Sequence, residues 1–240
     1  MENPYLPPNA RVDDVQPAAV GKLASLTKWV VWGLYAQLVI SVIALISGTL
    51  EHQLLVDFQQ GRYGDEGAAQ AAGEANDQRQ MLIGFTQMFV FIASGVLILM
   101  WIYRANANAR QLGAEGMQFT PRGSVVWYFV PVANLFMPYR ALREIWQVSA
   151  APHAWTREMT PRLFPLWWAS WIVSGMAGQV AMRMAMSAKT LDALLGANVA
   201  SLASEITSIP LLLVFLVIVK RIAAMQASHQ VPDATLQQLV

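Results

Sequence analysis

The chain has 240 residues, of which 55% are hydrophobic and only 13% are charged, and its mean hydropathy is +0.39. This composition excludes an ordinary soluble domain, and a net charge of +1 excludes a strong bulk attraction to nucleic acid. The absence of cysteine excludes disulfides, thiolate metal sites and thiol redox chemistry.

The N-terminal tail, residues 1–26, is polar and rich in proline, a residue that favours extended conformations. Two interpretations remain open for it: a disordered tail and a docking motif for a partner. The first apolar run starts only at Trp29 and lasts about 20 residues. We therefore expect an uncleaved membrane anchor rather than a secretory signal.

Four long apolar runs follow one another along the chain. They cover residues 29–50, 81–103, 164–186 and 206–219. Because a helix needs about 20 apolar residues to cross ~30 Å of hydrocarbon, the sequence predicts a multi-pass membrane domain over residues 27–223, with a second polar tail at 224–240. The acidic segment 51–80, between the first two runs, has a background of glycine, alanine and glutamine that predicts a solvated loop.

Residues 123–138 decide the predicted topology. A straight helix of this length would reach about 24 Å, short of the ~30 Å core, and Pro131 would break it near its middle. If the segment crosses the membrane, lysine and arginine divide 8 to 8 between the two sides; if it enters and returns, they divide 12 to 4. The twelve are Arg11, Lys22, Lys28, Arg104, Arg110, Arg122, Arg140, Arg143, Arg157, Arg162, Lys220 and Arg221, against Arg62, Arg79, Arg183 and Lys189.

Short basic loops remain in the cytoplasm. We therefore expect an all-α membrane protein with four transmembrane helices, a Pro-broken re-entrant or interfacial segment, and both termini in the cytoplasm. All nine tryptophans fall toward the cytoplasmic half in this arrangement, where lipid anchoring is one explanation and extra interfacial structure is the other.

Residues 139–150 predict an amphipathic helix lying in the membrane interface. Its apolar face is expected to carry Leu142, Ile145, Trp146 and Ser149, and its polar face Arg140, Arg143, Glu144 and Gln147. Pro138 lies just before this helix, where proline is tolerated.

The third run has small residues every four positions, namely Ser170, Ser174 and Gly178. Such spacing allows close helix packing in lipid, and we expect packing within the chain rather than a dimer face. Arg183 and Glu205 are expected to lie at the outer surface and to pair there. Gln87 and Gln179 are interpreted as buried hydrogen-bonding residues between helices.

No pattern of catalytic or metal-binding residues stands out. The three histidines are isolated in the sequence, and no phosphate-binding loop or nucleophile motif is present. Neither a metal nor a cofactor is therefore expected.

One block of the sequence resembles a known family. It runs from Trp101-Ile-Tyr-Arg104-Ala-Asn106-Ala-Asn108-Ala-Arg110, through Thr120-Pro121 and Val126-Trp127-Tyr128-Phe129-Val-Pro131-Val-Ala-Asn134, to Pro138-Tyr139-Arg140-Ala-Leu-Arg143-Glu144-Ile-Trp146, with Leu166-Trp167-Trp168 downstream. It is similar to the bacterial multi-pass membrane proteins of domain-of-unknown-function family 4328, over about residues 30–222. The resemblance implies an inner-membrane location and no established activity.

The polar residues of this block form the candidate site. They are Arg104, Asn106, Asn108, Arg110, Asn134, Arg140 and Arg143. We expect a basic cytoplasmic pocket, because the re-entrant topology brings both arginine pairs to one surface. Asn134 is expected to satisfy backbone groups freed by Pro131 or to line a water-filled cavity. Topology signalling by these arginines is the alternative explanation.

The leading functional hypothesis is a non-enzymatic scaffold, accessory or sensory subunit that binds anionic lipid headgroups or a protein partner at its cytoplasmic face. The second is a small transporter or channel that uses the broken segment, because discontinuous helices often form binding sites. A membrane-embedded enzyme ranks third.

Overall fold

The computed structural model describes residues 17–229 and contains only helices and their connections in that range. The predicted all-α fold is confirmed. In chain order the helices are α1 (Pro17–Gln59), α2 (Glu66–Gln111), α3 (Gly123–Val126), the 3-10 turn η2 (Ala133–Leu135), α4 (Met137–Ala150), the 3-10 turn η3 (Trp155–Arg157), α5 (Leu163–Ser187) and α6 (Leu191–Ser228).

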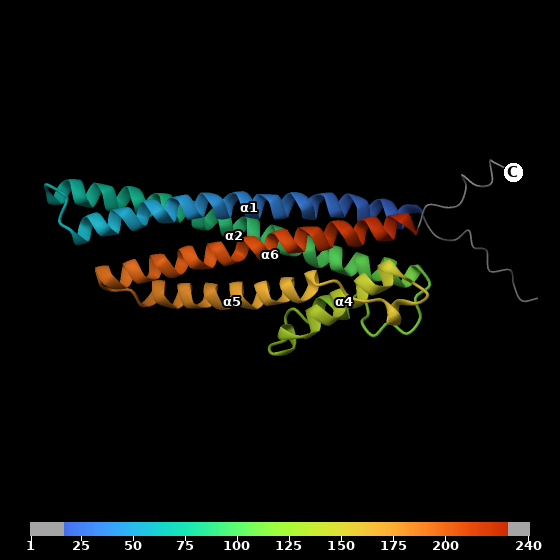
Figure 1. Cartoon of the computed structure of the whole chain (residues 1–240). Coiled ribbons are helices and arrows are strands. Elements are labelled where there is room, and N and C mark those ends of the chain that lie inside the picture. The colour runs from blue at the N-terminus through green and yellow to red at the C-terminus, as the bar shows by residue number, and fades with distance from the viewer. Residues whose placement is uncertain (1–16, 230–240) are drawn as a thin grey trace, which may run out of the picture.

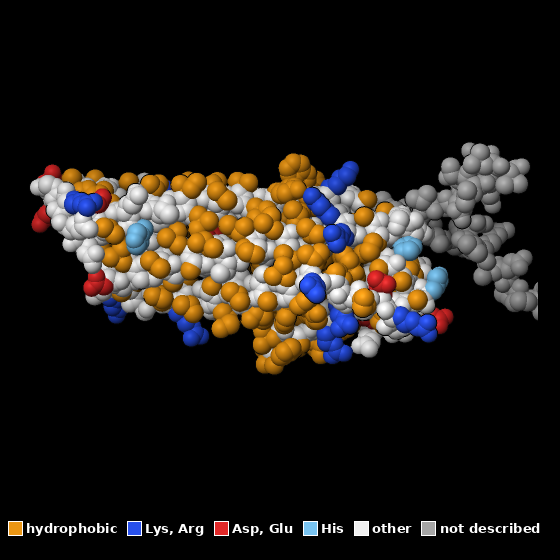
Figure 2. Space-filling model, in the orientation of Figure 1, with side chains coloured by type: hydrophobic (Ala, Val, Ile, Leu, Met, Phe, Trp, Pro, Cys, Tyr) orange, Lys and Arg blue, Asp and Glu red, His pale blue; other side chains and the backbone are white. Residues whose placement is uncertain are grey.

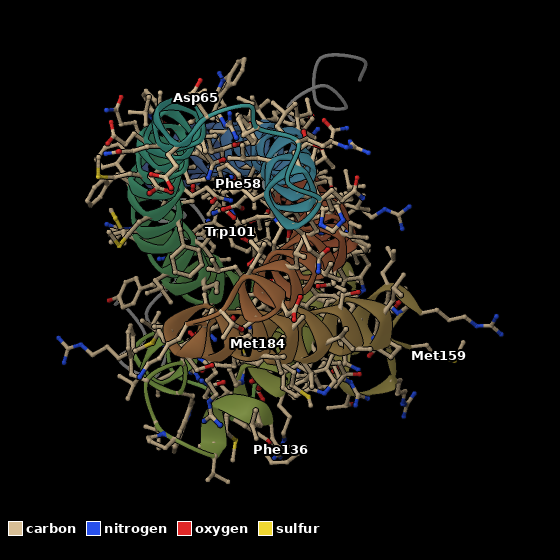
Figure 3. The ribbon with its side chains drawn as sticks, turned by 90° about the vertical axis from the view of Figure 1, so that its left-hand side faces the viewer. Phe58, Asp65, Trp101, Phe136, Met159 and Met184 are labelled. Carbon is tan, nitrogen blue, oxygen red and sulfur yellow. The ribbon has the colours of Figure 1, made fainter. Side chains whose placement is uncertain are left out.

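The four long helices form two antiparallel hairpins (Figure 1). α1 packs along α2, α5 packs along α6, and the two hairpins meet where α1 packs along α6. α2 and α5 share at most a marginal contact. The helices therefore make a curved layer in the order α2–α1–α6–α5, which the view along the helices shows (Figure 3).

The described chain begins and ends at the same end of this bundle, named here the terminal end (Figure 1). The opposite, hairpin end carries the connections 60–65 and 188–190. Side chains cap both hairpins: Asp65 accepts a hydrogen bond of 2.7 Å from the Ala68 N–H, and Thr190 accepts one of 3.2 Å from Ala193. Such caps satisfy N–H groups that a helix cannot satisfy itself.

Three helices are long and apolar enough to cross a membrane: α1, α2 and α6. α1 and α2 have 43 and 46 residues, so each is roughly 65–70 Å long, about twice the ~30 Å hydrocarbon thickness. Both continue toward the hairpin end, and only residues 60–65 connect them. The predicted solvated loop over 51–80 is therefore wrong. At the other end, α1 includes residues 17–26, and α6 extends through Ser228.

The hydrophobic core lies toward the terminal end and surrounds α4. Trp101 of α2, Ile145 of α4, Phe164 of α5 and Ile218 of α6 are all completely buried there. α4 contacts α2, α5 and α6. This short helix thus packs on the terminal half of the bundle through α2, α5 and α6.

The predicted faces of α4 are only half right. Leu142, Ile145, Trp146 and Ser149 are buried as expected, and Arg140 and Arg143 are exposed. Glu144 and Gln147, placed on the polar face by their spacing, are buried as well. The reason is that neighbouring loops cover this face: Glu144 binds residues 118 and 119, and the Gln147 Nε2 donates to the Glu158 carbonyl at 2.6 Å.

Residues 123–138 do not form one helix. A single turn, α3, is followed by turns, by η2 and by the start of α4 at Met137. Val132, directly after Pro131, has φ +66° and ψ −49°, and the Ala133 N–H donates to the Pro131 carbonyl at 2.8 Å. This is a tight γ-turn, a conformation that is strained for a β-branched residue.

The tryptophans do not form a uniform exposed collar. Trp29 and Trp32 are 62% and 68% exposed, whereas Trp101, Trp146 and Trp167 are core residues. The ring of Trp146 packs edge-on against Phe164, and that of Trp167 stacks on Phe215. Internal packing therefore explains part of the tryptophan clustering that lipid anchoring was invoked to explain.

Candidate functional site

Three of the seven predicted site residues, Asn106, Arg110 and Arg140, contact residues 117–119 at the terminal end. Two side chains one turn apart on α2 bind this loop. The Asn106 Nδ2 donates to the Phe119 carbonyl at 3.1 Å, and the Arg110 guanidinium donates to the carbonyls of Phe119 and Met117 at 2.7 and 3.2 Å. Asn106 is completely buried. Both side chains hold the loop in place and are not free to bind a ligand.

Glu144 of α4 holds the same loop from its N–H side. Its two carboxylate oxygens accept hydrogen bonds from the N–H groups of Gln118 and Phe119, the second at 3.0 Å. Burial raises the pKa of Glu144, while these hydrogen bonds and the charges of Arg110 and Arg140 lower it in part. The carboxylate thus neutralises part of the basic character expected for this pocket.

Three of the four candidate arginines have exposed side chains: Arg104, Arg140 and Arg143. Arg140 donates to the Gln118 Oε1 at 3.4 Å, and its guanidinium carbon lies 6.0 Å from the centre of the Phe119 ring. The structure therefore brings Arg110 and Arg140 to one loop. Arg104 and Arg143 make no hydrogen bond or salt bridge within residues 23–229.

The two remaining candidate asparagines have different surroundings. Asn108 is 3% exposed, and its Nδ2 has no partner in the described structure. Asn134 is half-buried, and its Oδ1 is likewise enclosed without a partner. Asn134 lies at the edge of a groove of 690 Å³ along α5, which extends past Trp171 to Arg183.

Exposed basic residues lie close in sequence to exposed apolar ones on every long helix and on α4. Each long helix and α4 has such a pair within about one turn. The pairs are Lys28 with Trp29 on α1, Arg104 with Tyr103 on α2, Arg140 with Phe136 at the start of α4, Arg162 with Leu166 at the start of α5, and Lys220 with Val217 on α6.

In every pair the basic residue is the one nearer the terminal end, given the direction of its helix (Figure 1). We name these five pairs the boundary ring. Figure 2 shows the same pattern on one face: apolar groups protrude partway along the molecule, and lysine and arginine side chains gather immediately on their terminal side. Phe136, in the ring, lies outside the bundle (Figure 3). This order is the one expected at a hydrocarbon–water boundary.

The predicted pairing of Arg183 with Glu205 is wrong. α6 begins at Leu191, so Glu205 lies 14 residues inside the helix rather than at its start. Its Oε1 accepts a hydrogen bond of 2.7 Å from the Gln87 Nε2 of α2. Gln87 thus bonds between helices as predicted, whereas Gln179 is exposed.

Small residues of α5 face α6. A Cβ on Gly178 would lie 3.6 Å from the Ser204 Oγ, and Ala181 is 7% exposed. Ser170 and Ser174 on the same helix are half-buried. Within this stripe, Gly178 therefore packs against α6. No group of three or more potential metal ligands occurs in residues 23–229.

Sequence reasoning missed a polar cluster near the hairpin end. Glu51 of α1 accepts hydrogen bonds from Gln80 of α2 at 3.1 Å and from Asn198 of α6 at 2.8 Å. Asn198 also bonds His52 and the Gly48 carbonyl. The signal in the sequence is the amide-rich run 76–80. It resembles a loop because the segment around it is acidic.

These features define a helical protein with three helices able to cross a membrane and with a boundary ring of paired basic and apolar residues. The family described as domain of unknown function (DUF4328) matches residues 65–224, two thirds of the sequence, and the chain belongs to that family. No curated protein and no solved structure matches the chain.

Proposed function

We propose that this chain is a four-span protein of the bacterial cytoplasmic membrane, with both termini in the cytoplasm. α5 is the fourth spanning helix. Its 25 residues reach about 38 Å, enough for the ~30 Å core, and it packs along α6 from the boundary ring to the hairpin end. In this arrangement the broken segment 123–138 is an interfacial or re-entrant segment at the level of the boundary ring.

The proposed role is a non-enzymatic membrane protein whose terminal end binds anionic phospholipid headgroups. The boundary ring carries this proposal, because it places exposed arginines where headgroup phosphates would lie. A guanidinium can bind phosphate through two parallel hydrogen bonds. Each basic residue near an anionic leaflet gains about 1 kcal/mol. Arg104 and Arg140 of the ring are the candidate residues, together with Arg143, which is exposed about one turn further along α4. Arg110 is excluded by its bonds to the 117–119 loop.

The test compares two triple variants that lose the same charge. One changes Arg104, Arg140 and Arg143 to glutamine; the control changes Arg62, Arg183 and Lys189, which lie toward the hairpin end. Native mass spectrometry would measure cardiolipin and phosphatidylglycerol retained after purification. We expect the first variant to retain at least tenfold less lipid, because three basic residues together contribute ~3 kcal/mol of binding free energy. The control should retain as much lipid as the unmodified protein.

Equal lipid retention in both variants would contradict the proposal. Retention by the unmodified protein should also fall with added salt, because screening weakens exposed charge pairs. A loss of retention in the control variant alone would place the lipid at the opposite leaflet.

A further inference from the structure

Three cavities join into one groove along the inner side of the curved helix layer. Nearest the hairpin end lies a cavity of 290 Å³, followed by two of 430 Å³. Gln87 and Glu205 line both the first and the second cavity. Phe91, Leu211 and Leu212 line both the second and the third. The groove lies within α1, α2, α5 and α6, and the edge helices α2 and α5 flank it.

The chemistry of the groove changes along its length. The part nearest the hairpin end contains Glu51, Gln80, Asn198 and Glu205. The part nearest the terminal end is apolar and aromatic. Tyr128 and Phe129 of the broken segment line it together with Trp167 and Trp171 of α5 and Phe215 of α6. Such a polar-to-apolar gradient suits an amphiphile with one polar head and one apolar chain.

Glu205 has no cationic partner in this groove. Glu51 accepts amide hydrogen bonds from both Gln80 and Asn198, whereas Glu205 accepts one, from Gln87. No lysine or arginine lines any of the three cavities. A half-buried carboxylate among apolar helices is costly unless a cation accompanies it, and an ionisable residue in such a segment is a functional-site hypothesis by default.

We propose that this groove binds a cationic single-chain amphiphile, with a primary ammonium head at Glu205 and its chain directed toward Phe215. Along α6 these two residues are about 15 Å apart, a length that roughly a dozen carbons span at C–C bonds of ~1.5 Å. The ammonium donates to the Glu205 carboxylate. The chain lies against Phe91, Leu211 and Leu212, and the aromatic residues of the broken segment limit its length.

Recognition of the ammonium group is tested with a variant that removes the charge of Glu205. The full-length protein in phosphatidylcholine nanodiscs is titrated calorimetrically with dodecylamine and with dodecanol, which has the same chain without the charge; empty nanodiscs give the reference for partitioning. We expect the amine to bind at least tenfold more tightly than the alcohol. Glu205→Gln should abolish this preference while leaving dodecanol affinity within about twofold.

The binding site for the apolar chain of the amphiphile is tested without changing Glu205. A Cβ on Gly95, which lines the apolar part of the groove, would have no neighbour within 4 Å, so the side chain of Gly95→Leu starts in open space and takes up room in the groove. Gly175 of α5 is equally open but lines the groove beside Asn134, which shares only Trp171 with the apolar part of the proposed site. We expect Gly95→Leu to weaken both ligands at least tenfold and Gly175→Leu to weaken neither.

Equal affinity for amine and alcohol in the unmodified protein would overturn the proposal, as would unchanged amine affinity in either Glu205→Gln or Gly95→Leu. If Glu205→Gln does not fold, the comparison of Gly95→Leu with Gly175→Leu still tests whether the groove binds the ligand. This groove is independent of the boundary ring, so failure of one proposal leaves the other standing.

Discussion

Glu144 illustrates how a single residue acquires its role from contacts distant in the chain. Its spacing in α4 places it beside Arg140 and Arg143, but it is 4% exposed because the 117–119 loop covers it. Both backbone N–H groups that it binds come from this loop. No helical periodicity contains that information, because the loop lies 25 residues earlier in the sequence.

Glu144→Ala should lower the thermal stability of the detergent-solubilised protein. Each buried N–H left without an acceptor costs about 1–3 kcal/mol, so the expected fall in Tm is about 5 °C or more. The measurement is a thermal unfolding curve. Arg143→Ala is the control, since this neighbour is exposed and should change stability by less than about 0.5 kcal/mol. Similar melting of the two variants would mean that the loop is not held by Glu144.

The γ-turn at Val132 gives a second test at this scale. Its side chain is 72% exposed, so removing it loses little packing, while its positive φ stores strain of about 1–3 kcal/mol. Val132→Gly should therefore keep or raise Tm, even though glycine costs about 0.5–1 kcal/mol in entropy. Val126→Gly, at an exposed position of α3 with helical backbone, should lower Tm. A higher Tm for Val126→Gly than for Val132→Gly would show that the γ-turn at Val132 is not strained.

At the scale of elements, the apolar runs predicted where the long helices lie but not where they end. Hydrophobicity marks the part of a helix that lipid surrounds, and it says nothing about the polar turns that continue beyond it. For this reason the sequence predicts a loop over residues 51–59 and 66–80, although α1 and α2 contain them. The break at residues 123–138 was predictable, because Pro131 acts locally through its own ring and missing N–H.

The candidate site was predicted less well than the helices. Arg140 and Arg143 are exposed as expected, but Arg110 is occupied with loop carbonyls. The bond between Gln87 and Glu205 joins residues 118 positions apart. Contacts of this kind depend on which helices are neighbours, and one sequence does not fix that order.

For the whole molecule, the proposed topology places the two hairpin connections outside and the terminal end inside. Single cysteines can test this, because the natural chain has none. Gln60 and Ser187 are exposed at the hairpin end, and Thr156 and Ser228 are exposed at the terminal end. In intact cells an impermeant thiol reagent should label cysteines at Gln60 and Ser187 but not at Thr156 or Ser228. If Gln60 is labelled and Thr156 is not, labelling at Ser228 without labelling at Ser187 would show that α5 does not cross.

The packing of α1 against α6 affects the order in which the helices assemble during synthesis. α1 meets α2 as soon as that helix is made, but its contact with α6, such as the 2.9 Å bond from the Lys220 ammonium to the Tyr35 hydroxyl, spans 185 residues. At ~5–20 residues per second, α6 is complete roughly ten seconds after the hairpin of α1 and α2. Until then Glu51 lacks the hydrogen bond that Asn198 of α6 donates to it. A chain that stops before α6 remains in this half-assembled state. We expect it to be degraded in cells unless residues 163–240 are supplied as a separate chain.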